Sequence, residues 1–301
     1  MSETASRSGP VPTLHVRPRY GRWISATILL VAAGSFLYSL YTNENLQVDA
    51  IREYLFNAEI LRGVVVTLEL TAICFTVGLL GGLVLAVMRL SDNPVLSIVS
   101  AVYVWVFRSI PPLVQLIFWA FFAALYPRLT FGVPFTGVEF VDVGTNSVIG
   151  PFMAAVIGLT LIEIAYTAEV IRGGISGVER GQALAARALG MGAMLTLQKI
   201  VLPQAMPSIV PPLGNNLVNL VKATSLVSVI GGAELMTQVQ NIYGQNYAVI
   251  PLLSVAAIWY LAITGVLTVA QSLIERHYSK GARSTDGRRV NRSATAGAPE
   301  L

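Results

Sequence analysis

Six long runs of apolar residues, separated by shorter polar segments, dominate the pattern along the chain. Each run is at least as long as the roughly 20 residues that a helix needs to cross the hydrocarbon core of a bilayer. None of the runs alternates with the two-residue period of barrel strands, so the pattern predicts membrane-spanning helices. The predicted spans cover residues 23–42, 64–88, 95–126, 148–171, 209–231 and 250–274. We therefore expect an all-α, polytopic membrane protein.

The composition agrees with a chain embedded in a bilayer. Of the 301 residues, 54% are hydrophobic and only 12% are charged. Soluble domains carry about 25% charged residues, so an ordinary soluble enzyme is a poor fit. The single cysteine, Cys74, cannot form an internal disulfide. No segment between the spans is long enough to hold a separate soluble domain.

Lysine and arginine residues gather in alternate loops. If both termini are cytoplasmic, the inner segments contain 15 of these residues, whereas the outer segments contain three together with seven acidic residues. Positively charged loops stay on the cytoplasmic side, so we expect both termini inside. The net charge of +4 then reflects membrane topology, and no nucleic acid partner is expected. The inner segments are residues 1–22, 89–94, 172–208 and 275–301.

The two ends of the chain have their own expected roles. Residues 1–22 are expected to form a cytoplasmic tail and residues 281–301 a mobile cytoplasmic tail, because both are rich in small and polar residues. The first span has a second interpretation, a cleaved signal peptide. Its long apolar run and the absence of a clear A-x-A site favour an uncleaved extra helix over residues 23–42.

The loop over residues 172–207 is far longer than two neighbouring helices need. Its small and apolar residues predict a short helix, a sharp turn at Gly190, and a second apolar helix that ends near Pro203. Docking in a partner's groove and lying flat on the membrane surface both suit this pattern. Four apolar residues spaced i, i+4, i+7 and i+11 are expected to share one face: Leu184, Ala188, Met191 and Leu195.

The letters of this loop match a known pattern. Residues 172–191 read R-G-G-I-S-G-V-E-R-G-Q-A-L-A-A-R-A-L-G-M, and I-V-L-P-Q-A and P-P-L-G-N follow. They resemble the EAA loop of ABC importer permeases, in particular the polar amino acid uptake family. Further matches lie at residues 67–71, 89–91, 107–116, 222–226 and 251–252. The resemblance therefore covers about residues 55–280.

Three positions depart from the family pattern. Leu184 stands where the loop usually has its glutamate, and Met206-Pro207-Ser208 replaces a segment that usually contains an arginine. Ile162 stands where some members have an asparagine before a glutamate. The first two changes affect polar contacts with the ATPase, and the third affects the expected substrate cavity.

The resemblance implies a type I importer permease with five core helices over residues 55–280, plus one extra amino-terminal helix. It implies a bacterial plasma (inner) membrane location and import of a polar amino acid or a derivative. The implied partners are an ABC ATPase subunit, an extracellular or periplasmic amino acid-binding protein, and a second permease in a homodimer or heterodimer. The residues implied to couple to the ATPase are Gly181, Gln182, Leu184, Ala185, Ala186, Ala188, Leu189, Gly190 and Met191.

The chain has no phosphate-binding loop of the form G-x-x-x-x-G-K-[ST]. We therefore expect no enzymatic activity on this chain, and energy for transport from a partner or an ion gradient. The resemblance implies that this chain binds no cofactor and that ATP and Mg²⁺ are held by the partner ATPase.

Charged residues within the predicted spans are candidates for function, because each costs free energy in hydrocarbon unless it is paired or hydrated. Glu163 is the deepest candidate, and it either holds a substrate ammonium group or pairs with a neighbouring helix. Lys222 either lines the pathway or pairs across a dimer. The candidate residues of the substrate pathway are Glu69, Glu163, Lys222, Thr224 and Ser225.

Other polar and small residues have two interpretations each. Arg108 precedes Ile110-Pro111-Pro112, which is expected to break the third span, and an interfacial elbow is favoured over a cavity lining. The G-x-x-x-G motif at Gly78 and Gly82 favours packing within the subunit over a dimer contact. Three asparagines favour interhelical hydrogen bonds over ligand contacts: Asn215, Asn216 and Asn219.

Two other function classes fit the sequence less well. An ion-coupled secondary amino acid transporter would use the intramembrane acids as ion sites, but it predicts internal repeats that the sequence lacks. An intramembrane enzyme needs a nucleophile with a base, or metal ligands, at membrane depth. The two histidines, His15 and His277, lie outside the spans. Glutamate-like, basic and zwitterionic substrates all stay open at this point.

Overall fold

The computed structural model describes residues 20–133 and 138–295. It divides into two compact units, residues 1–48 and 49–301. Most of the expected amino-terminal tail, residues 1–19, and the last residues of the expected carboxy-terminal tail, 296–301, lie outside the described residues.

The first unit contains one long helix, α1 (Tyr20–Tyr41), followed by the short 3₁₀ helix η1 (Glu44–Leu46). From Trp23 onward every side chain of α1 is exposed, apolar ones included. A helix that is apolar on all sides suits lipid surroundings, because it has no polar face to turn toward water. The helix corresponds to the first predicted span.

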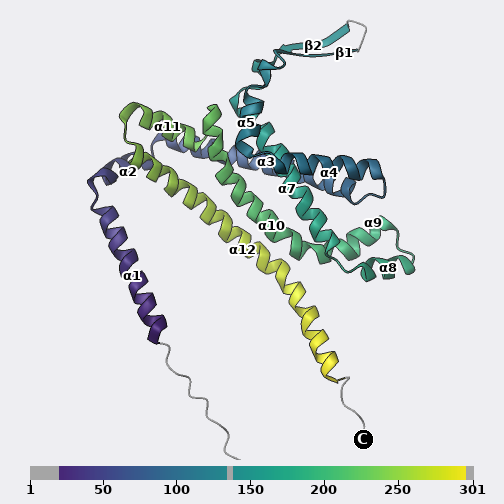
Figure 1. Ribbon diagram of the computed structural model, residues 1–301. Coiled ribbons are helices and arrows are strands. Elements are labelled where there is room, and N and C mark those ends of the chain that lie inside the picture. The colour runs from purple at the N-terminus through teal and green to yellow at the C-terminus, as the bar shows by residue number, and fades with distance from the viewer. Residues whose placement is uncertain (1–19, 134–137, 296–301) are drawn as a thin grey trace, which may run out of the picture. The chain divides into compact units, whose positions relative to one another are not determined.

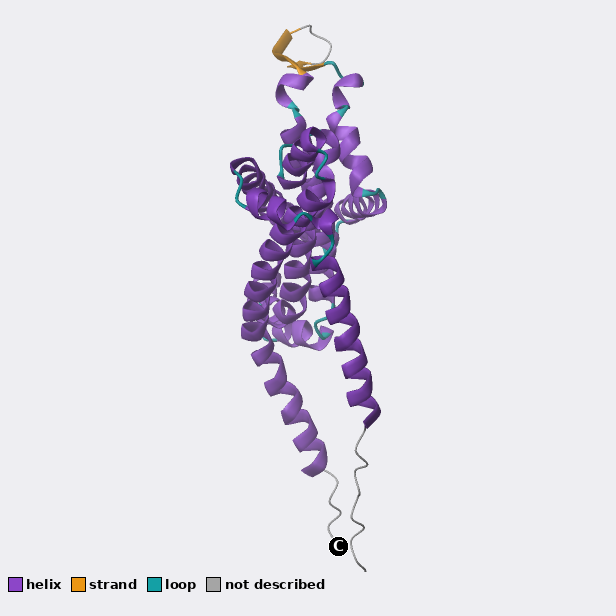
Figure 2. Cartoon of the chain, turned by 90° about the vertical axis from the view of Figure 1, so that its left-hand side faces the viewer, coloured by secondary structure: helices purple, strands orange, loops and turns teal. Residues whose placement is uncertain are grey.

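The second unit is almost entirely helical, as Figures 1 and 2 show. Its α-helices are α2 (Val48–Leu55), α3 (Ala58–Arg89), α4 (Pro94–Ser109), α5 (Pro112–Ala120), α6 (Thr145–Val148), α7 (Pro151–Ser176), α8 (Arg180–Ala188), α9 (Ala193–Thr196), α10 (Leu202–Ala223), α11 (Leu235–Asn246) and α12 (Val249–Thr295). Four shorter elements complete it: the 3₁₀ helices η2 (Phe122–Ala124) and η4 (Thr224–Ile230), the π-helical turn η3 (Leu197–Val201), and a hairpin of β1 (Arg128–Val133) and β2 (Val138–Gly144).

Four of the described helices are long and apolar enough to span a membrane, and two bent helix pairs bring the number to six. These six segments correspond to the six predicted spans. The helix α12 continues to Thr295, so residues 281–295, expected as part of a mobile tail, are helical.

Helices α3 and α7 pack closely along the centre of the second unit. Gly78 and Gly82 lie against α7, where an added Cβ would stand 2.5 Å from Cγ of Glu163 and 2.4 Å from Cγ2 of Thr167. Small residues let two helices approach closely, and here both belong to one chain. The structure thus bears out the expectation that this motif packs within the subunit.

The break predicted in the third span occurs between α4 and α5, which meet at a bend of 97°. Ile110 is extended, with φ −85° and ψ 126°, as a residue before proline prefers. Gln115 satisfies the backbone freed by the break, since its Nε2 donates to the carbonyls of Phe107 and Ile110 at 3.1 and 3.0 Å. Two of the carbonyls at the bend are therefore paired by a side chain of α5.

The second helix of the long loop does not end near Pro203, and that prediction is wrong. The chain continues from α9 through η3 into α10, which contains Pro207, Pro211 and Pro212. Immediately before Pro203 the backbone hydrogen bonds span five residues instead of four, because Leu202 donates its N–H to the carbonyl of Leu197. A π-helical turn of this kind accommodates a residue that has no N–H of its own.

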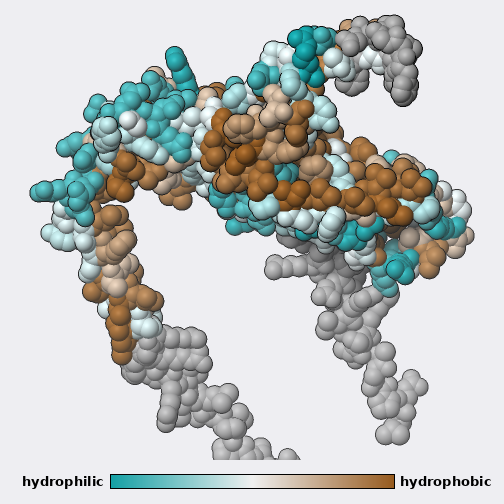
Figure 3. Space-filling model, turned by 45° about the horizontal axis from the view of Figure 1, so that its top comes forward, coloured by the Kyte–Doolittle hydropathy of each residue, from teal (hydrophilic) through white to brown (hydrophobic). Residues whose placement is uncertain are grey.

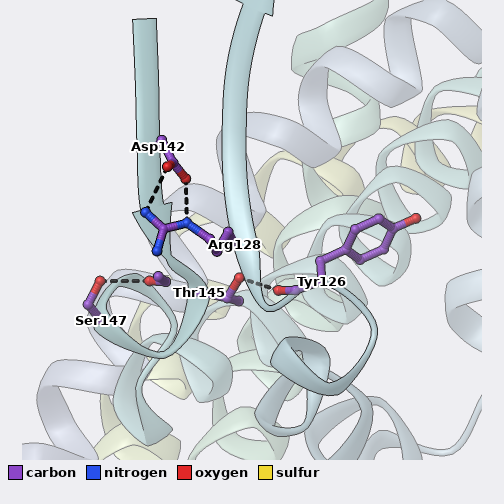
Figure 4. A network of polar contacts seen from close by, with 6 residues as sticks. Tyr126, Arg128, Asp142, Thr145 and Ser147 are labelled. Carbon is purple, nitrogen blue, oxygen red and sulfur yellow. Dashed lines mark hydrogen bonds and ion pairs between the residues drawn. The ribbon is translucent and has the colours of Figure 1, made fainter. Parts of the chain in front are cut away.

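The hairpin is the one described departure from an all-α fold. It lies between the third and fourth predicted spans, where no strand is predicted, and β1 and β2 pair antiparallel from Arg128–Gly144 to Val133–Val138. Figure 4 shows its base, where Arg128 and Asp142 form two hydrogen bonds of 2.7 Å and Thr145 Oγ1 donates to the carbonyl of Tyr126. The hydrogen bonds from Arg128 lower the pKa of Asp142 below its ordinary value.

Candidate functional site

A cavity of about 250 Å³ lies between α5, α7 and α10. We call it the Glu163 cavity. Most of its wall is apolar, and a few polar groups face it, which is the usual make-up of a small-molecule site. Its lining residues are Pro112, Leu159, Ile162, Glu163, Tyr166, Asn216, Asn219, Leu220 and Ala223.

Glu163 is the one acidic residue in this lining. Its side chain is 5% exposed, and it packs on Gly78 of α3. Among the described residues, its hydrogen-bond partner is Thr167, whose Oγ1 donates to Oε1 at 3.2 Å. A carboxylate has about four acceptor positions, so most of its capacity is left for a molecule in the cavity.

Two of the three asparagines also line the cavity. The Nδ2 atom of Asn216 is buried and has no hydrogen-bond partner among the residues that the structure describes. Asn219 lines the same wall one turn later. Asn215 instead accepts from Nε2 of Gln271 at 3.1 Å, which is an interhelical bond between α10 and α12. The expectation of interhelical bonds is therefore confirmed for Asn215, whereas Asn216 and Asn219 lie at the cavity.

The other predicted pathway residues lie away from this cavity. Glu69 and Lys222 are exposed on α3 and α10. Thr224 is buried, but its Oγ1 donates to the carbonyl of Val221, and Ser225 Oγ donates to that of Lys222. Of the five predicted residues, the structure thus brings Glu163 alone to the cavity wall.

The predicted coupling loop forms a helical hairpin. Gly181, Gln182, Leu184, Ala185, Ala186 and Ala188 lie on α8, and Leu189, Gly190 and Met191 form the turn after it. Gly190 has φ +80°, which only glycine adopts without strain, and this confirms the predicted sharp turn. Met191 donates its N–H to the carbonyl of Ala186 at 3.1 Å, which closes the helix end.

Most of the loop's apolar residues are exposed. Leu184 is 65% and Leu189 is 84% exposed, whereas Ala186 is buried. The predicted single face is wrong, because the turn at Gly190 puts Leu184 on α8 and Leu195 on α9. The exposed leucines nevertheless give the hairpin an apolar surface that no described residue covers.

A second buried carboxylate, that of Glu234, was not predicted from the sequence. It caps α11, and its oxygens accept from the N–H groups of Met236 and Thr237, from the Thr237 hydroxyl and from Tyr260 Oη, at 2.7 to 3.1 Å. Glutamate is not a favoured N-cap residue, so pattern alone did not mark it.

A second cavity also escaped sequence analysis. It measures about 450 Å³ and is lined by α4, by the last residue of α3 and by Tyr166 and Glu169 in the second half of α7. We call it the arginine cavity, because Arg89 and Arg108 line it. The guanidinium of Arg108 lies 5.2 Å from the ring centre of Tyr166, and Tyr166 borders both cavities. Arg108 therefore lines a cavity, and is more than an interfacial elbow.

Comparisons with known proteins agree with this architecture. The sequence model of the family described as "Binding-protein-dependent transport system inner membrane component" matches residues 78–280. The chain is 39% identical to the arginine transport system permease protein ArgU of Corynebacterium glutamicum, over 93% of this chain and 88% of that protein. It is 32% identical to the probable amino-acid ABC transporter permease protein YckA of Bacillus subtilis, over 75% of this chain and 96% of that protein.

Solved structures give the same answer. An amino acid ABC transporter crystallised with histidines superposes with a TM-score of 0.61 at 33% identity, covering 73% of this chain and 94% of that one. The inward-facing methionine transporter MetNI has a TM-score of 0.57 at 22% identity, covering 73% and 95%, and supports the fold alone. The chain belongs to the binding-protein-dependent inner membrane component family and is a multi-pass permease subunit of the amino acid ABC importer class.

Proposed function

We propose that this permease carries a basic amino acid of the arginine type inward across the plasma membrane, and that the Glu163 cavity holds the substrate on its way. The observation that carries the proposal is a buried carboxylate with one hydrogen bond, on the wall of a cavity of about 250 Å³. A relative over most of the chain's length is named an arginine transport permease, which supports this substrate class.

The cavity offers complementary groups for an amino acid. The Glu163 carboxylate suits a cationic ammonium or guanidinium group, because charge-assisted hydrogen bonds are about twice as strong as neutral ones. The unpaired Nδ2 of Asn216 suits a carboxylate oxygen, since a buried donor without a partner costs about 1–3 kcal/mol. The ring of Tyr166 adds a face on which a cation can rest.

Energy for transport comes, in this proposal, from an ATPase subunit that binds the α8–α9 hairpin. The exposed Leu184 and Leu189 supply an apolar contact surface, and the sequence has no phosphate-binding loop of its own. The hairpin then lies on the cytoplasmic side, and the excess of positive charge in alternate loops supports a cytoplasmic position for both termini as well. A second permease and an external amino acid-binding protein complete the assembly, with ATP and Mg²⁺ on the ATPase.

Helix α10 connects the hairpin with the cavity. It begins beside the π-helical turn and carries Asn216 and Asn219 in its later turns. Between them, Pro207, Pro211 and Pro212 each lack the N–H that would bond to the carbonyl four residues earlier. A helix weakened at these positions can bend when the hairpin moves, and this would change the shape of the cavity.

Uptake of labelled arginine into vesicles that contain the complete complex tests the substrate site. Glu163→Gln keeps the size of the side chain but removes its charge, and we expect uptake to fall roughly 10- to 100-fold. Glu69→Gln is the matched control, because Glu69 is exposed on α3, and it should leave uptake unchanged. Equal uptake by the two variants would refute the assignment of the cavity.

Purification of the tagged chain from native membranes in mild detergent tests the partners. We expect an ATPase subunit to copurify, and to be lost when residues 177–200 are deleted. Uptake that follows an ion gradient and continues after ATP depletion would instead support an ion-coupled secondary transporter.

A further inference from the structure

The arginine cavity has a feature that transport of an amino acid does not require, an excess of positive charge beside an exposed apolar surface. Arg89, Arg108 and Glu169 line the cavity together with Ser109, Tyr166 and Trp105. Glu169 already forms an ion pair with Arg172 of the same helix, with hydrogen bonds of 2.5 and 3.0 Å. Arg89 and Arg108 therefore share the cavity with one carboxylate, which already pairs with a third arginine.

Neither lining arginine has a carboxylate of its own. Within the part of the chain that the structure describes, no acid lies within 4.0 Å of the guanidinium of Arg89 or Arg108. Arg89 donates from Nη1 to the carbonyl and hydroxyl of Ser97 at 3.2 and 3.3 Å, and Arg108 rests on the ring of Tyr166. Each guanidinium has five donors, so both keep donors for an anion.

The cavity opens beside an exposed apolar stripe of α4. Trp105 belongs to both, since it lines the cavity and is 70% exposed. The other exposed members precede it at helical spacing: Val95, Ile98 and Val102. Figure 3 shows hydrophobic side chains gathered on the side of the second unit where α4 and α5 lie.

An amphiphile with an anionic head and apolar tails matches this arrangement. We propose that the arginine cavity binds the phosphate of an anionic phospholipid, with Arg89 and Arg108 as donors and the lipid chains along the apolar stripe of α4. Arginine pairs with phosphate through two parallel hydrogen bonds. Basic pockets between transmembrane helices and interfacial tryptophans are both typical of such sites.

Binding of a short-chain fluorescent phosphatidylglycerol to the purified, delipidated complex tests this proposal without any transport step. We expect it to bind at least about tenfold more tightly than the matching phosphatidylcholine, which carries the same phosphate but no net charge. Arg89→Gln and Arg108→Gln should each weaken binding roughly fivefold, and the double variant roughly 30-fold. Arg62→Gln, on the same helix as Arg89 but near its opposite end, is the matched control and should bind as the wild type does.

Lysine variants keep the test decisive if a glutamine variant fails to assemble. Arg89→Lys and Arg108→Lys retain the charge but not the paired donors, so we expect an intermediate loss of affinity. Equal binding of the two lipids, or a double variant that binds like the wild type, would overturn the proposal. Inorganic phosphate that binds as tightly as phosphatidylglycerol would assign the cavity to a free anion and overturn the lipid assignment.

Because this measurement reads lipid binding alone, its result is independent of which amino acid the permease carries.

Discussion

Two buried glutamates in this permease occupy opposite situations. Glu234 is fully buried at the start of α11 and accepts four hydrogen bonds, from two backbone N–H groups, Thr237 and Tyr260. Glu163 is almost as buried on α7, but it accepts one hydrogen bond and faces a cavity. The two side chains are therefore similarly buried, but they differ in the number of hydrogen bonds that their carboxylates accept.

The comparison separates a structural carboxylate from one that is free to bind a ligand. At Glu234 the protein itself supplies the donors that offset removal from water. At Glu163 much of that capacity is unused, and the nearest opening is the cavity that Asn216 and Tyr166 also line. The carboxylate of Glu234 should therefore affect mainly the stability of the fold, and that of Glu163 should affect mainly transport.

The largest expected effect is on stability, at Glu234. Glu234→Ala leaves two buried N–H groups and the Tyr260 hydroxyl without their acceptor, and we expect the free energy of unfolding to fall by about 3–5 kcal/mol. Glu53→Ala, an exposed residue of α2, is the control and should change it by less than about 0.5 kcal/mol. Thermal unfolding of the detergent-purified complex measures both, and similar midpoints would contradict the structural role.

A smaller effect is expected where α3 supports Glu163. Gly78→Ala puts a methyl group 2.5 Å from Cγ of Glu163, so we expect a loss of about 1–3 kcal/mol in stability and reduced uptake. Gly173→Ala on α7 is the control, because no atom lies within 4 Å of its added Cβ. Unfolding and uptake measured on both variants check this, and a fully active Gly78→Ala protein would show that the position of Glu163 is not critical.

The loop offers a closely matched pair of glycines. Neither Gly190 nor Gly192 has an atom within 4 Å of an added Cβ, but φ is +80° at the first and −63° at the second. Gly190→Ala should strain the turn by about 1–2 kcal/mol and weaken copurification of the ATPase, and Gly192→Ala should not. If the two variants retain the ATPase equally, the turn is not what positions the docking surface.

The smallest effect is expected in the hairpin, at the ion pair of Arg128 and Asp142. Because folding lowers the pKa of Asp142, the ion pair stabilises the hairpin above the unfolded value near 3.9 and loses this effect as the pH falls through the lower folded value. Hydrogen exchange of the hairpin amides, corrected for intrinsic rates, measures the loss. Asp142→Asn should abolish this pH dependence, and an unchanged profile would exclude the ion pair as its cause.

Sequence reasoning predicted what depends on local pattern. The six apolar segments, the break at Ile110-Pro111-Pro112 and the turn at Gly190 all follow from residues close in the chain. Glu163 was predicted as a charged residue within a span, and it lines a cavity. The hairpin was missed, although Leu129, Phe131 and Val133 alternate with polar or small residues as a strand does.

What sequence could not supply depends on residues far apart in the chain. The acceptor role of Glu234 needs Tyr260, which follows 26 residues later, and Leu235 beside it donates to Thr67, which lies 168 residues away. The arginine cavity likewise joins residues of three helices, α3, α4 and α7. The pattern of residues within one segment cannot predict contacts with residues so far away in the chain.

Equilibrium binding of labelled arginine to the purified complex, with Glu163→Gln and Glu234→Gln measured side by side, tests the central claim most directly. The account predicts that Glu163→Gln loses binding roughly 10- to 100-fold while its unfolding midpoint stays that of the wild type. It predicts the reverse for Glu234→Gln, a lower midpoint with unchanged affinity in the folded fraction. A Glu163→Gln complex that binds arginine as the wild type does would contradict the claim that this carboxylate holds the substrate.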